Sequence, residues 1–445
     1  MNDPRTTRRA LLIDQYELTM AQAYLAGGME ERATFSLFVR ELPDSRNLLL
    51  ACGLEAVLDW LEALRFDGET LAYLESLGLS SRLLGWLEGL RFEGDVRAMP
   101  EGTPFFPDEP VLEVDAPLPQ AQLVESFVMN QIHSQTVLAS KASRVVRAAA
   151  GRRVLDFGLR RMHGADGAVW GARAYHVAGL TGTSNVAAGE RFDVTVSGTM
   201  AHSFVQAFDD ELDAFRAFVR EFPETILLVD TYDTMEGIEK VIRLAREIGD
   251  GFGVRGVRID SGDLGDLATR ARARLDEAGL DDLIVVVSGG LTDLDIARLV
   301  AEGRPIDGFG VGTSMGVSED APKLDMAYKL VEYAGVGRMK TSTGKVTLPG
   351  RKQVFRQDGR DVIARHGESL PGRPLLEPVM EGGRRTEAAP RGEADGGRAR
   401  ARRELAALPA RVTALEPADP PYEVVRSEAM EAHLAEVRRR VSGGG

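Results

Sequence analysis

The pattern of hydrophobic and polar residues divides the chain into three parts with different predicted structures. In the first 150 residues, apolar side chains at helical spacing alternate with a short strand and with proline-rich extended chain, which predicts an accessory domain of helices and strands. The last piece of this part has the spacing of one long amphipathic helix that leads into the second part. The predicted elements are helices at 10–30, 53–65, 69–90 and 120–150, a strand at 33–40, and extended chain at 95–119.

The second part, residues 151–357, repeats one structural unit. Short runs of β-branched residues end in small or polar side chains, and a helical pattern follows each run. The ends of four late runs, at Asp230, Asp260, Ser288 and Gly312, are 30, 28 and 24 residues apart. That spacing fits a strand, a helix and two loops. Continuous apolar strands covered by helices are typical of a parallel sheet, and about seven such units predict an α/β barrel.

The third part, residues 358–445, has the weakest pattern. Glycine, proline and arginine are mixed over 382–403, a composition typical of a flexible linker. A last helix is predicted around 427–440. It ends in three consecutive arginines, and this basic run suits the negative end of a helix dipole, so no partner is assigned to it.

The composition excludes several classes of protein. The chain has 68 acidic against 54 basic residues and a formal net charge of −14, which argues against a nucleic-acid or anionic-membrane binder. Its one cysteine, Cys52, cannot form an intrachain disulfide, and no zinc motif is present. The first residues lack the pattern of a signal peptide, and no uncharged apolar stretch reaches the ~18 residues of a membrane helix. A cytoplasmic protein is therefore expected.

Two glycine-rich turns at the ends of predicted strands are candidate phosphate sites. They are Ser288-Gly289-Gly290 and Gly312-Thr313. Each turn enters a predicted helix, so its exposed amides and the helix dipole favour an anion. Glycine also eases tight turns without any ligand, and this alternative stays open.

Carboxylates follow two neighbouring predicted strands. Asp230 and Asp233 end one strand, and Asp260 and Asp263 end the next, with Arg258 two residues before Asp260. A carboxylate pair beside phosphate turns suits Mg²⁺ held partly by substrate oxygens, although each aspartate can equally cap the helix that follows. The guanidinium of Arg258 is a natural bidentate partner for a carboxylate or phosphate, unless it forms a plain salt bridge with Asp260.

Three further side chains stand out by their positions. His202 follows a strand and begins a helix at the predicted catalytic end of the barrel. A neutral imidazole there can act as a base or accept a phosphoryl group, whereas a lone histidine is more often structural. Phe157 and Tyr16, taken alone, are ordinary candidates for core aromatics.

Taken together and in this order, the motifs resemble those of the nicotinate phosphoribosyltransferase family. The resemblance covers about residues 10–357, and the tail after 358 matches weakly. It rests on DQYELTMAQAY, FSLFVRELP, ACGLE, QTVLASKASR, DFGLRR, GTSNV, GTMAHS, LLVDTYDT, GVRIDSGD, VVSGG and GVGTS.

The resemblance implies a fold and a reaction. The fold is an irregular parallel α/β barrel with an accessory α/β domain of mixed sheet, built from the N-terminal segment and part of the C-terminus. A homodimer with shared active sites is implied. The reaction joins nicotinate to 5-phosphoribosyl 1-diphosphate, with Mg²⁺, to give nicotinate mononucleotide and diphosphate, the first step of NAD synthesis from nicotinate. ATP is implied as a co-substrate, hydrolysed through a transient phosphohistidine.

The family's nicotinate-binding residues carry over to matching positions. Phe157 would stack on one face of the pyridine ring, and Tyr16 of the partner subunit would stack on the other. Arg258, together with Arg160, would hold anionic substrate groups. Thr199 would line the nicotinate pocket.

The remaining carried-over residues concern specificity and catalysis. Ser184, in GTSN, stands where the similar nicotinamide-using enzymes carry an aspartate, and a serine avoids repulsion with a substrate carboxylate. His202 matches the phosphorylated histidine, and Asp260 would meet the ribose hydroxyls, so both are expected to be catalytic. The two glycine-rich turns would cradle the 5-phosphate. Lys141 and Arg144, on the helix before the barrel, are candidates for stabilising the departing diphosphate.

Two other functions compete with this interpretation. One is a nicotinamide or quinolinate phosphoribosyltransferase of similar architecture. Ser184 argues against the amide, and His202 argues against the quinolinate enzymes, which need no ATP. The other is a non-catalytic barrel that binds a phosphorylated ligand, which would not be labelled by ATP.

Overall fold

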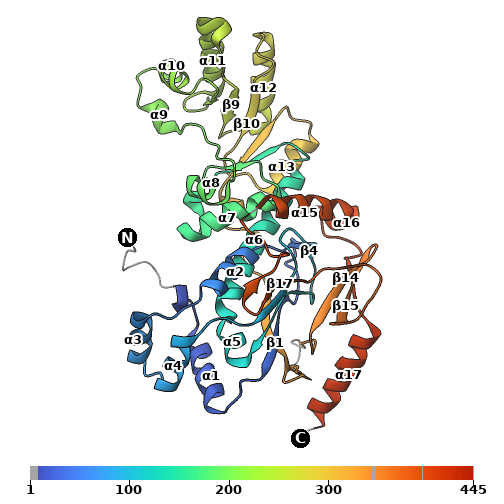
Figure 1. Ribbon diagram of the computed structural model, residues 1–445. Coiled ribbons are helices and arrows are strands. Elements are labelled where there is room, and N and C mark those ends of the chain that lie inside the picture. The colour runs from blue at the N-terminus through green and yellow to red at the C-terminus, as the bar shows by residue number, and fades with distance from the viewer. Residues whose placement is uncertain (1–8, 343–346, 393, 444–445) are drawn as a thin grey trace. The chain divides into compact units, whose positions relative to one another are not determined.

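The structure is a computed structural model that describes residues 9–342, 347–392 and 394–443. The chain forms two compact units (Figure 1). The accessory unit comprises Met1–Val137 and Lys323–Gly445, and the barrel unit comprises Leu138–Pro322. These limits differ from the predicted ones at 150 and 357. The linking helix is divided between the units, and the first strand after Pro322 joins the accessory sheet.

A seven-stranded sheet forms the centre of the accessory unit. One of its inner strands, β1, pairs antiparallel with β12 on one side and with β5 on the other, which confirms the predicted strand at 33–40. Phe35 and Leu37 lie in the core, while the Ser36 hydroxyl between them donates to Glu113 (2.6 Å). In order across the sheet, the strands are β13 (Val336–Gly337), β12 (Met326–Tyr333), β1 (Arg32–Val39), β5 (Pro110–Pro117), β3 (Asp95–Ala98), β17 (Glu377–Glu381) and β18 (Arg384–Arg385).

Two smaller sheets complete the strands of this unit. β14 and β15 form an antiparallel hairpin, and Arg356 on the first strand makes a bidentate ion pair with the buried Asp361 on the second (3.0 and 2.6 Å). The strands are β16 (Arg373–Pro374), β14 (Lys352–Arg356), β15 (Arg360–Arg365) and β19 (Glu423–Arg426) in one sheet, and β2 (Leu49–Leu50) with β4 (Pro104–Phe105) in the other.

The helices of the first part differ from prediction in two places. The segment 69–90 is two helices, because Gly78 adopts φ +83° after the first and the Ser80 side chain caps the second. The segment 120–150 is also two helices: the chain becomes helical at Leu118, with proline in the first turn, and is interrupted at Val124. The helices are α1 (Gln15–Ala26), α2 (Leu54–Ala63), α3 (Gly68–Ser76), α4 (Ser81–Gly89), α5 (Leu118–Leu123) and α6 (Glu125–Ala148), after a 3₁₀ turn at Arg9–Leu11.

The prediction of a flexible linker at 382–403 is wrong, because its first half contains strand β18 with Arg385 paired to Asp59, and its second half is helical. Residues Ala394–Ala407 form helix α15, which packs closely on the turn at Glu101 and Gly102. The Arg400 side chain donates to the Glu101 carbonyl (3.0 Å), so the helix is held by tertiary contacts that composition does not reveal. The short helix α16 (Ala410–Thr413) follows. The predicted last helix is confirmed as α17 (Glu428–Ser442), capped by the Ser427 side chain.

A six-stranded parallel sheet forms the barrel unit. Its last strand in sequence, β11, pairs with its first, β6, so the sheet curls back on itself. One of the seven predicted runs, the one that contains Val196, is not a strand of this sheet but is joined to it by a parallel bridge with Thr183. Between this bridge and β8, no pairing is found within the described residues, so the sheet is a half-barrel. In order, the strands are β7 (Gly182–Thr183), β6 (Arg153–Asp156), β11 (Gly308–Val311), β10 (Ile284–Val287), β9 (Gly256–Ile259) and β8 (Ile226–Leu228).

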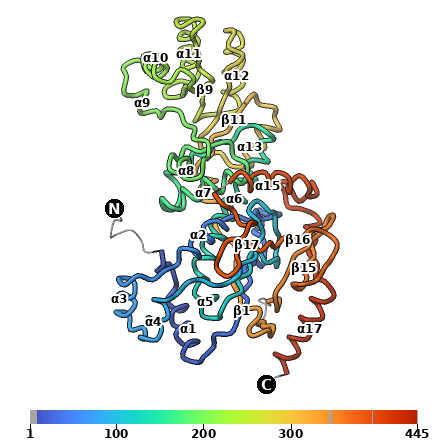
Figure 2. The backbone as a smooth tube through the Cα atoms, in the orientation of Figure 1, coloured from blue at the N-terminus to red at the C-terminus, as the bar shows by residue number. Residues whose placement is uncertain are grey.

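Helices follow the strands of the barrel unit in alternation, as the spacing predicts. The largest, α11, buries one face through Ile238, Val241 and Ile242, and the paths of α10, α11 and α12 run side by side (Figure 2). Among the described helices, none is both long and apolar enough to cross a membrane. The helices that follow the strands of the barrel unit are α7 (Ala165–Ala178), α8 (Val186–Phe192), α9 (His202–Gln206), α10 (Glu211–Glu221), α11 (Thr234–Ile248), α12 (Leu264–Glu277), α13 (Asp293–Ala301) and α14 (Thr313–Gly316), with 3₁₀ turns at Leu159–Arg161 and Gly249–Gly251.

The contact between α15 and its turn can be tested with a pair of glycine variants. Gly102 and Gly78 have the same φ of +83°. A methyl group at Gly102 would overlap the Gly397 carbonyl of α15, whereas a methyl group at Gly78 would meet no atom within 4 Å among the described residues. Gly78→Ala should cost about 1–2 kcal/mol of unfolding free energy, and Gly102→Ala about 1–3 kcal/mol more. Trypsin should cleave the arginines of α15 faster only in Gly102→Ala. Equal cleavage in both variants would show that α15 is not anchored at this turn.

Candidate active site

Most of the predicted site residues of the barrel unit lie at one edge of its parallel sheet. Parallel strands present their carboxyl ends at the same edge, and the loops that follow them gather side chains from distant parts of the sequence. Phe157 follows β6, Ser184 follows β7, His202 begins α9, Asp230 follows β8, Asp260 follows β9, Ser288 follows β10 and Gly312 follows β11.

An aromatic ring and a guanidinium lie together at this edge. The Arg258 Cζ is 5.7 Å from the centroid of the Phe157 ring, within reach of a cation–π interaction. Arg258 Nη2 donates to the Met200 carbonyl (2.8 Å), while its buried Nε has no hydrogen-bond partner among the described residues. Burial lowers the pKa of the guanidinium, against the raising effect of neighbouring aspartates. Arginine stays charged despite such a shift, so the group retains an unused donor for an anion.

The Phe157 ring has room only because β11 carries a glycine. A methyl group at Gly310 would overlap two atoms of the ring and come within 3.1 Å of the Ser288 Cβ. The Phe157 N–H donates to the Val311 carbonyl (2.8 Å), which extends the β6–β11 pairing to the site. The ring is half-buried, with one strand behind it, so it is a wall of the site and not a core residue.

A buried carboxylate, which the sequence interpretation missed, holds the loops of Phe157 and Ser184. Asp156 is 1% exposed and accepts from the Gly158 N–H (2.7 Å) and the Thr183 hydroxyl (2.6 Å). Its carbonyl accepts from the Ser184 N–H (2.9 Å). Burial raises the pKa of the Asp156 carboxyl. Asp156 directly precedes Phe157 at the end of a strand, and this position was the available signal for its role.

Asp260 is the centre of a polar cluster. One of its carboxylate oxygens accepts from the Ser288 hydroxyl, and the other lies 3.8 Å from His202 Nε2. His202 is 39% exposed in its side chain, and its Nδ1 is 3.1 Å from the Thr231 hydroxyl. Asp230 accepts from the Asp260 N–H (3.0 Å) through Oδ2. The predicted proximity of His202, Asp260 and Ser288 is therefore present in the structure.

The carboxylates differ in their suitability for Mg²⁺. Asp233 and Asp263 cap α11 and α12, so the capping alternative holds for these two. Asp230 is nearly buried, with Oδ1 unpartnered among the described residues, whereas the Asp260 side chain is 37% exposed. No group of three or more possible metal ligands occurs in the described part of the chain. Asp260 fits a cation that takes most of its ligands from substrate oxygens, which is the usual arrangement for Mg²⁺.

Both glycine-rich turns have backbone shapes that depend on glycine. Gly289 has φ +100°, and a methyl group there would overlap the Asp260 carbonyl; Gly290 has φ +67°. Gly312 precedes α14, and the exposed Thr313 begins that helix. The turns therefore expose backbone where side chains would otherwise stand, and they lie on adjacent strands, β10 and β11.

Four of the predicted residues lie away from this cluster or at its margin. Thr199 is half-buried next to Met200, and Arg160 is exposed on the 3₁₀ turn after Phe157. Lys141 and Arg144 are buried on α6 and paired with Asp293, which α13 contributes. These ion pairs lower the pKa of Asp293 although burial alone would raise it.

Tyr16 belongs to the accessory unit. It lies on α1 and is 45% exposed, so it is not a core aromatic. Partial burial and then the nearby Glu125 and Glu17 raise the pKa of its hydroxyl, which keeps it neutral. Its predicted role across a subunit boundary stays a prediction.

Comparison with known proteins identifies the family. Residues 11–133 match the nicotinate phosphoribosyltransferase (NAPRTase) N-terminal domain, and residues 152–353 match the nicotinate phosphoribosyltransferase (NAPRTase) family. The chain belongs to the nicotinate phosphoribosyltransferase family. It is 53% identical over 436 residues to nicotinate phosphoribosyltransferase pncB2 of Mycobacterium tuberculosis, covering 96% of this chain and 94% of the relative. That alignment extends past 357, so the likeness to the family includes more of the tail than the motifs alone indicate.

Two solved structures share the fold of this nicotinate phosphoribosyltransferase family member. Human nicotinic acid phosphoribosyltransferase superposes with a TM-score of 0.84 at 28% identity, covering 96% of this chain and all of that one. Nicotinate-nucleotide pyrophosphorylase from Pyrococcus furiosus superposes with a TM-score of 0.74 at 25% identity, covering 91% and 98%. The predicted α/β class is thus confirmed, with the barrel as a curled half-barrel sheet.

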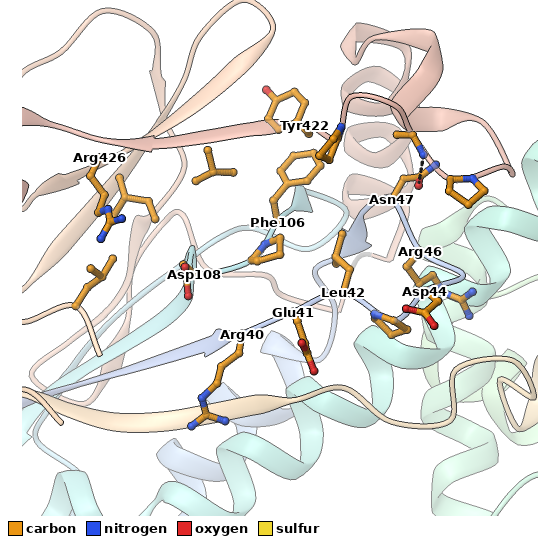
Figure 3. A pocket seen from close by; sticks show the side chains of 18 residues that line it. Arg40, Glu41, Leu42, Asp44, Arg46, Asn47, Phe106, Asp108, Tyr422 and Arg426 are labelled. Atoms are coloured by element: carbon orange, nitrogen blue, oxygen red, sulfur yellow. Dashed lines mark hydrogen bonds between the residues drawn. The ribbon is translucent and has the colours of Figure 1, made fainter. Parts of the chain in front are cut away.

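A pocket in the accessory unit of this family member contains none of the predicted site residues. Its cavity of about 540 Å³ lies among the loop after β1, the turn before β5 and the C-terminal segment (Figure 3). Arg40 at its edge is paired with Asp325 (2.6 Å), and the Phe106 and Tyr422 rings stack on each other with centroids 3.9 Å apart. The Asn47 side chain accepts from the Ala418 N–H of the C-terminal segment (2.9 Å; Figure 3), and its amide nitrogen donates to two carbonyls of the same segment. These contacts assign the pocket to packing of that segment.

The support that Gly310 provides to Phe157 can be tested against a second glycine on the same face of β11. Gly310→Ala should lower the free energy of unfolding by about 1–3 kcal/mol, because the ring or the strand must move. Gly308→Ala should be close to neutral, since its methyl group would meet neighbours at 3.4 Å or more. Urea unfolding of both variants measures the difference. Equal stability of the two would show that the ring is not confined by β11.

Proposed function

We propose that this protein is a nicotinate phosphoribosyltransferase that joins nicotinate to 5-phosphoribosyl 1-diphosphate and releases diphosphate. The observation that carries the proposal is the half-buried guanidinium of Arg258 beside the Phe157 ring, with an unused Nε donor. An anionic aromatic acid matches this pair, because the ring can stack while the carboxylate accepts from the guanidinium. The names of the relatives support the same substrate.

The proposed nicotinate pocket is built around that pair. Phe157 stacks on one face of the pyridine ring, and Tyr16 of the partner subunit stacks on the other, in a homodimer with shared sites. Arg160 adds positive charge at the margin, and Thr199 lines the pocket. Ser184 provides a neutral wall where an aspartate would repel the acid, so nicotinate is preferred over nicotinamide.

The proposed site for 5-phosphoribosyl 1-diphosphate lies along the next strands. Asp260 meets the ribose hydroxyls, and the turns Ser288-Gly289-Gly290 and Gly312-Thr313 present amides to the 5-phosphate. Asp260 would also hold a Mg²⁺ ion together with substrate oxygens, and such an ion would supply positive charge for the departing diphosphate.

The transfer itself needs little acid–base chemistry. The lone pair of the pyridine nitrogen forms a bond to C1 of the ribose, and the C1–oxygen bond breaks so that diphosphate leaves with its electron pair. The protein holds the nitrogen in line with C1 and offers charge to the departing diphosphate, which are effects of orientation and electrostatics. The product, nicotinate mononucleotide, is a precursor for NAD synthesis, and we propose that the reaction takes place in the cytoplasm.

We further propose that ATP hydrolysis drives the reaction through His202. Contact of Nδ1 with the Thr231 hydroxyl orients the ring, whose side chain is 39% exposed, with Nε2 3.8 Å from an Asp260 oxygen. Nε2 attacks the γ-phosphorus of ATP, the bond to the bridging oxygen breaks, and ADP leaves. Water later hydrolyses the phosphohistidine. The adjacent Asp260 couples the charge of this group to the ribose site.

The test of the function is a product assay on the purified protein. It supplies 5-phosphoribosyl 1-diphosphate and Mg²⁺ with nicotinate, nicotinamide or quinolinate, each with and without ATP. We expect nicotinate mononucleotide from nicotinate alone, increased by ATP, with ADP released. Turnover of nicotinamide or quinolinate would instead identify a nicotinamide or quinolinate phosphoribosyltransferase. No product from any of the three would support a non-catalytic barrel that binds a phosphorylated ligand.

His202→Ala should abolish labelling by γ-³²P-ATP and all stimulation by ATP, while a slow ATP-independent transfer persists, because the phosphoryl acceptor is lost but the substrate pockets remain. The matched control is His163→Ala, an exposed histidine of the same unit, which should keep both labelling and stimulation. Acid-labile label is measured alongside initial rates. ATP stimulation that survives in His202→Ala removes this residue from the mechanism.

A further inference from the structure

A buried group of charges lies behind the two glycine-rich turns. Lys141 Nζ is 2.5 Å from Asp293 Oδ1 and 2.8 Å from Asp320 Oδ1, and Arg144 Nε is 2.7 Å from Asp293 Oδ2. The Lys141 side chain is 2% exposed, and those of Arg144 and Asp293 are 5% and 4% exposed. All four residues belong to the barrel unit, although they come from three separate segments of the chain.

This ion group is connected to both turns through the backbone. Asp293 is the first residue of α13, the helix that the turn after β10 enters, and Asp320 follows α14, the helix that the turn after β11 enters. The Ser314 hydroxyl of α14 donates to the Leu291 carbonyl in the segment before α13 (2.5 Å). Lys141 therefore links the start of α13 to the segment that follows α14, and Ser314 independently links the segment before α13 to α14 itself.

The ammonium of Lys141 is poorly placed to contact a substrate. Two carboxylates already share it, and it has almost no exposed surface. Withdrawing a buried ammonium from such partners would leave Asp293 and Asp320 short of a counter-charge, which is costly in a low-dielectric interior. Its position is better suited to holding the segments of Asp293 and Asp320 together than to binding a mobile diphosphate.

We propose that Lys141 is a positioning residue which, by binding Asp293 and Asp320 together, sets the spacing of the two glycine-rich turns and so their affinity for a 5-phosphate. The inference rests on the proposed function for the identity of that phosphate. It assigns Lys141 a role through the turns in place of direct contact with the diphosphate, and it gives Asp293 a role that the sequence did not indicate.

Ribose 5-phosphate separates the two roles, because it carries the 5-phosphate but no diphosphate. In titration calorimetry, Lys141→Met and Asp293→Asn should each weaken ribose 5-phosphate by about tenfold or more, since a small displacement of binding groups has large effects. In the double variant the losses should not add, because both residues act through one contact. In kinetics, KM for 5-phosphoribosyl 1-diphosphate should rise while KM for nicotinate stays unchanged.

Direct contact between Lys141 and the diphosphate predicts the opposite pattern. Lys141→Met would then weaken 5-phosphoribosyl 1-diphosphate but not ribose 5-phosphate, and Asp293→Asn, which frees the ammonium, would leave both ligands bound as in the wild type. Either result overturns the proposal. Lys240→Met is the matched control, because Lys240 also pairs with a buried carboxylate, that of Glu211 (2.9 Å), in the same unit. It should leave ribose 5-phosphate affinity unchanged.

A second variant and the use of calorimetry keep the test of Lys141 valid if Lys141→Met does not fold or if the proposed function is wrong. If Lys141→Met does not fold, Asp320→Asn is used, because Asp320 is the more exposed partner (31%) and its loss keeps the Asp293 pair. It should weaken ribose 5-phosphate in the same direction but less, and unchanged affinity counts against the proposal. Calorimetry needs no turnover, so a wild-type protein that binds ribose 5-phosphate but makes no nicotinate mononucleotide rejects the proposed function and still tests Lys141.

Discussion

The parallel pairing of β11 with β6 is the constraint on which the candidate site depends. It brings the last strand of the barrel unit beside the first, and the Phe157 N–H continues the pairing one residue beyond the strands. The ring can then lie against β11 only where that strand has no side chain, at Gly310. Arg258 approaches the same ring from β9. The wall of the proposed aromatic-acid site thus depends on one strand pairing and one missing side chain.

Around this centre, buried carboxylates orient the loops while more exposed groups face the ligand space. Asp156 and Asp230 are nearly buried and accept from backbone amides and hydroxyls, so they fix the loop shapes. Asp260 and His202 keep more than a third of their side-chain surface exposed. This division matches general requirements for catalysis, because a reacting group must be held by neighbours whose own positions are fixed. Lys141 and Asp293 extend the same arrangement one layer further from the site.

Much of this site could be predicted from the chain alone, since strand ends in a repeating β–α pattern must gather at one edge. The predictions that failed did so for different reasons, and one of them concerns a segment whose structure depends on distant partners. The range 382–403 has the composition of a linker, yet α15 forms within it because Gly397 and Arg400 pack on the turn at Gly102 and Glu101. The segment 69–90 has continuous helical spacing, but Gly78 and Ser80 divide it, a local signal that was available. Asp156 was missed although it directly precedes Phe157 at a strand end, because its burial and its bond to Thr183 are seen only in the structure.

What the sequence by itself determined is the periodic alternation of strands and helices, the glycine turns and the residue types at the strand ends, since these depend on local spacing and backbone conformation. Tertiary structure alone decided which of those residues meet. It left Asp260 open toward His202, whereas Asp233 and Asp263 cap the helices that follow them, which the sequence already allowed. It also buried Lys141 in an ion group instead of leaving it free for a substrate. The physical reason is that burial and ion pairing depend on segments brought together from far apart in the chain, and no local pattern encodes which partner a charged side chain will find.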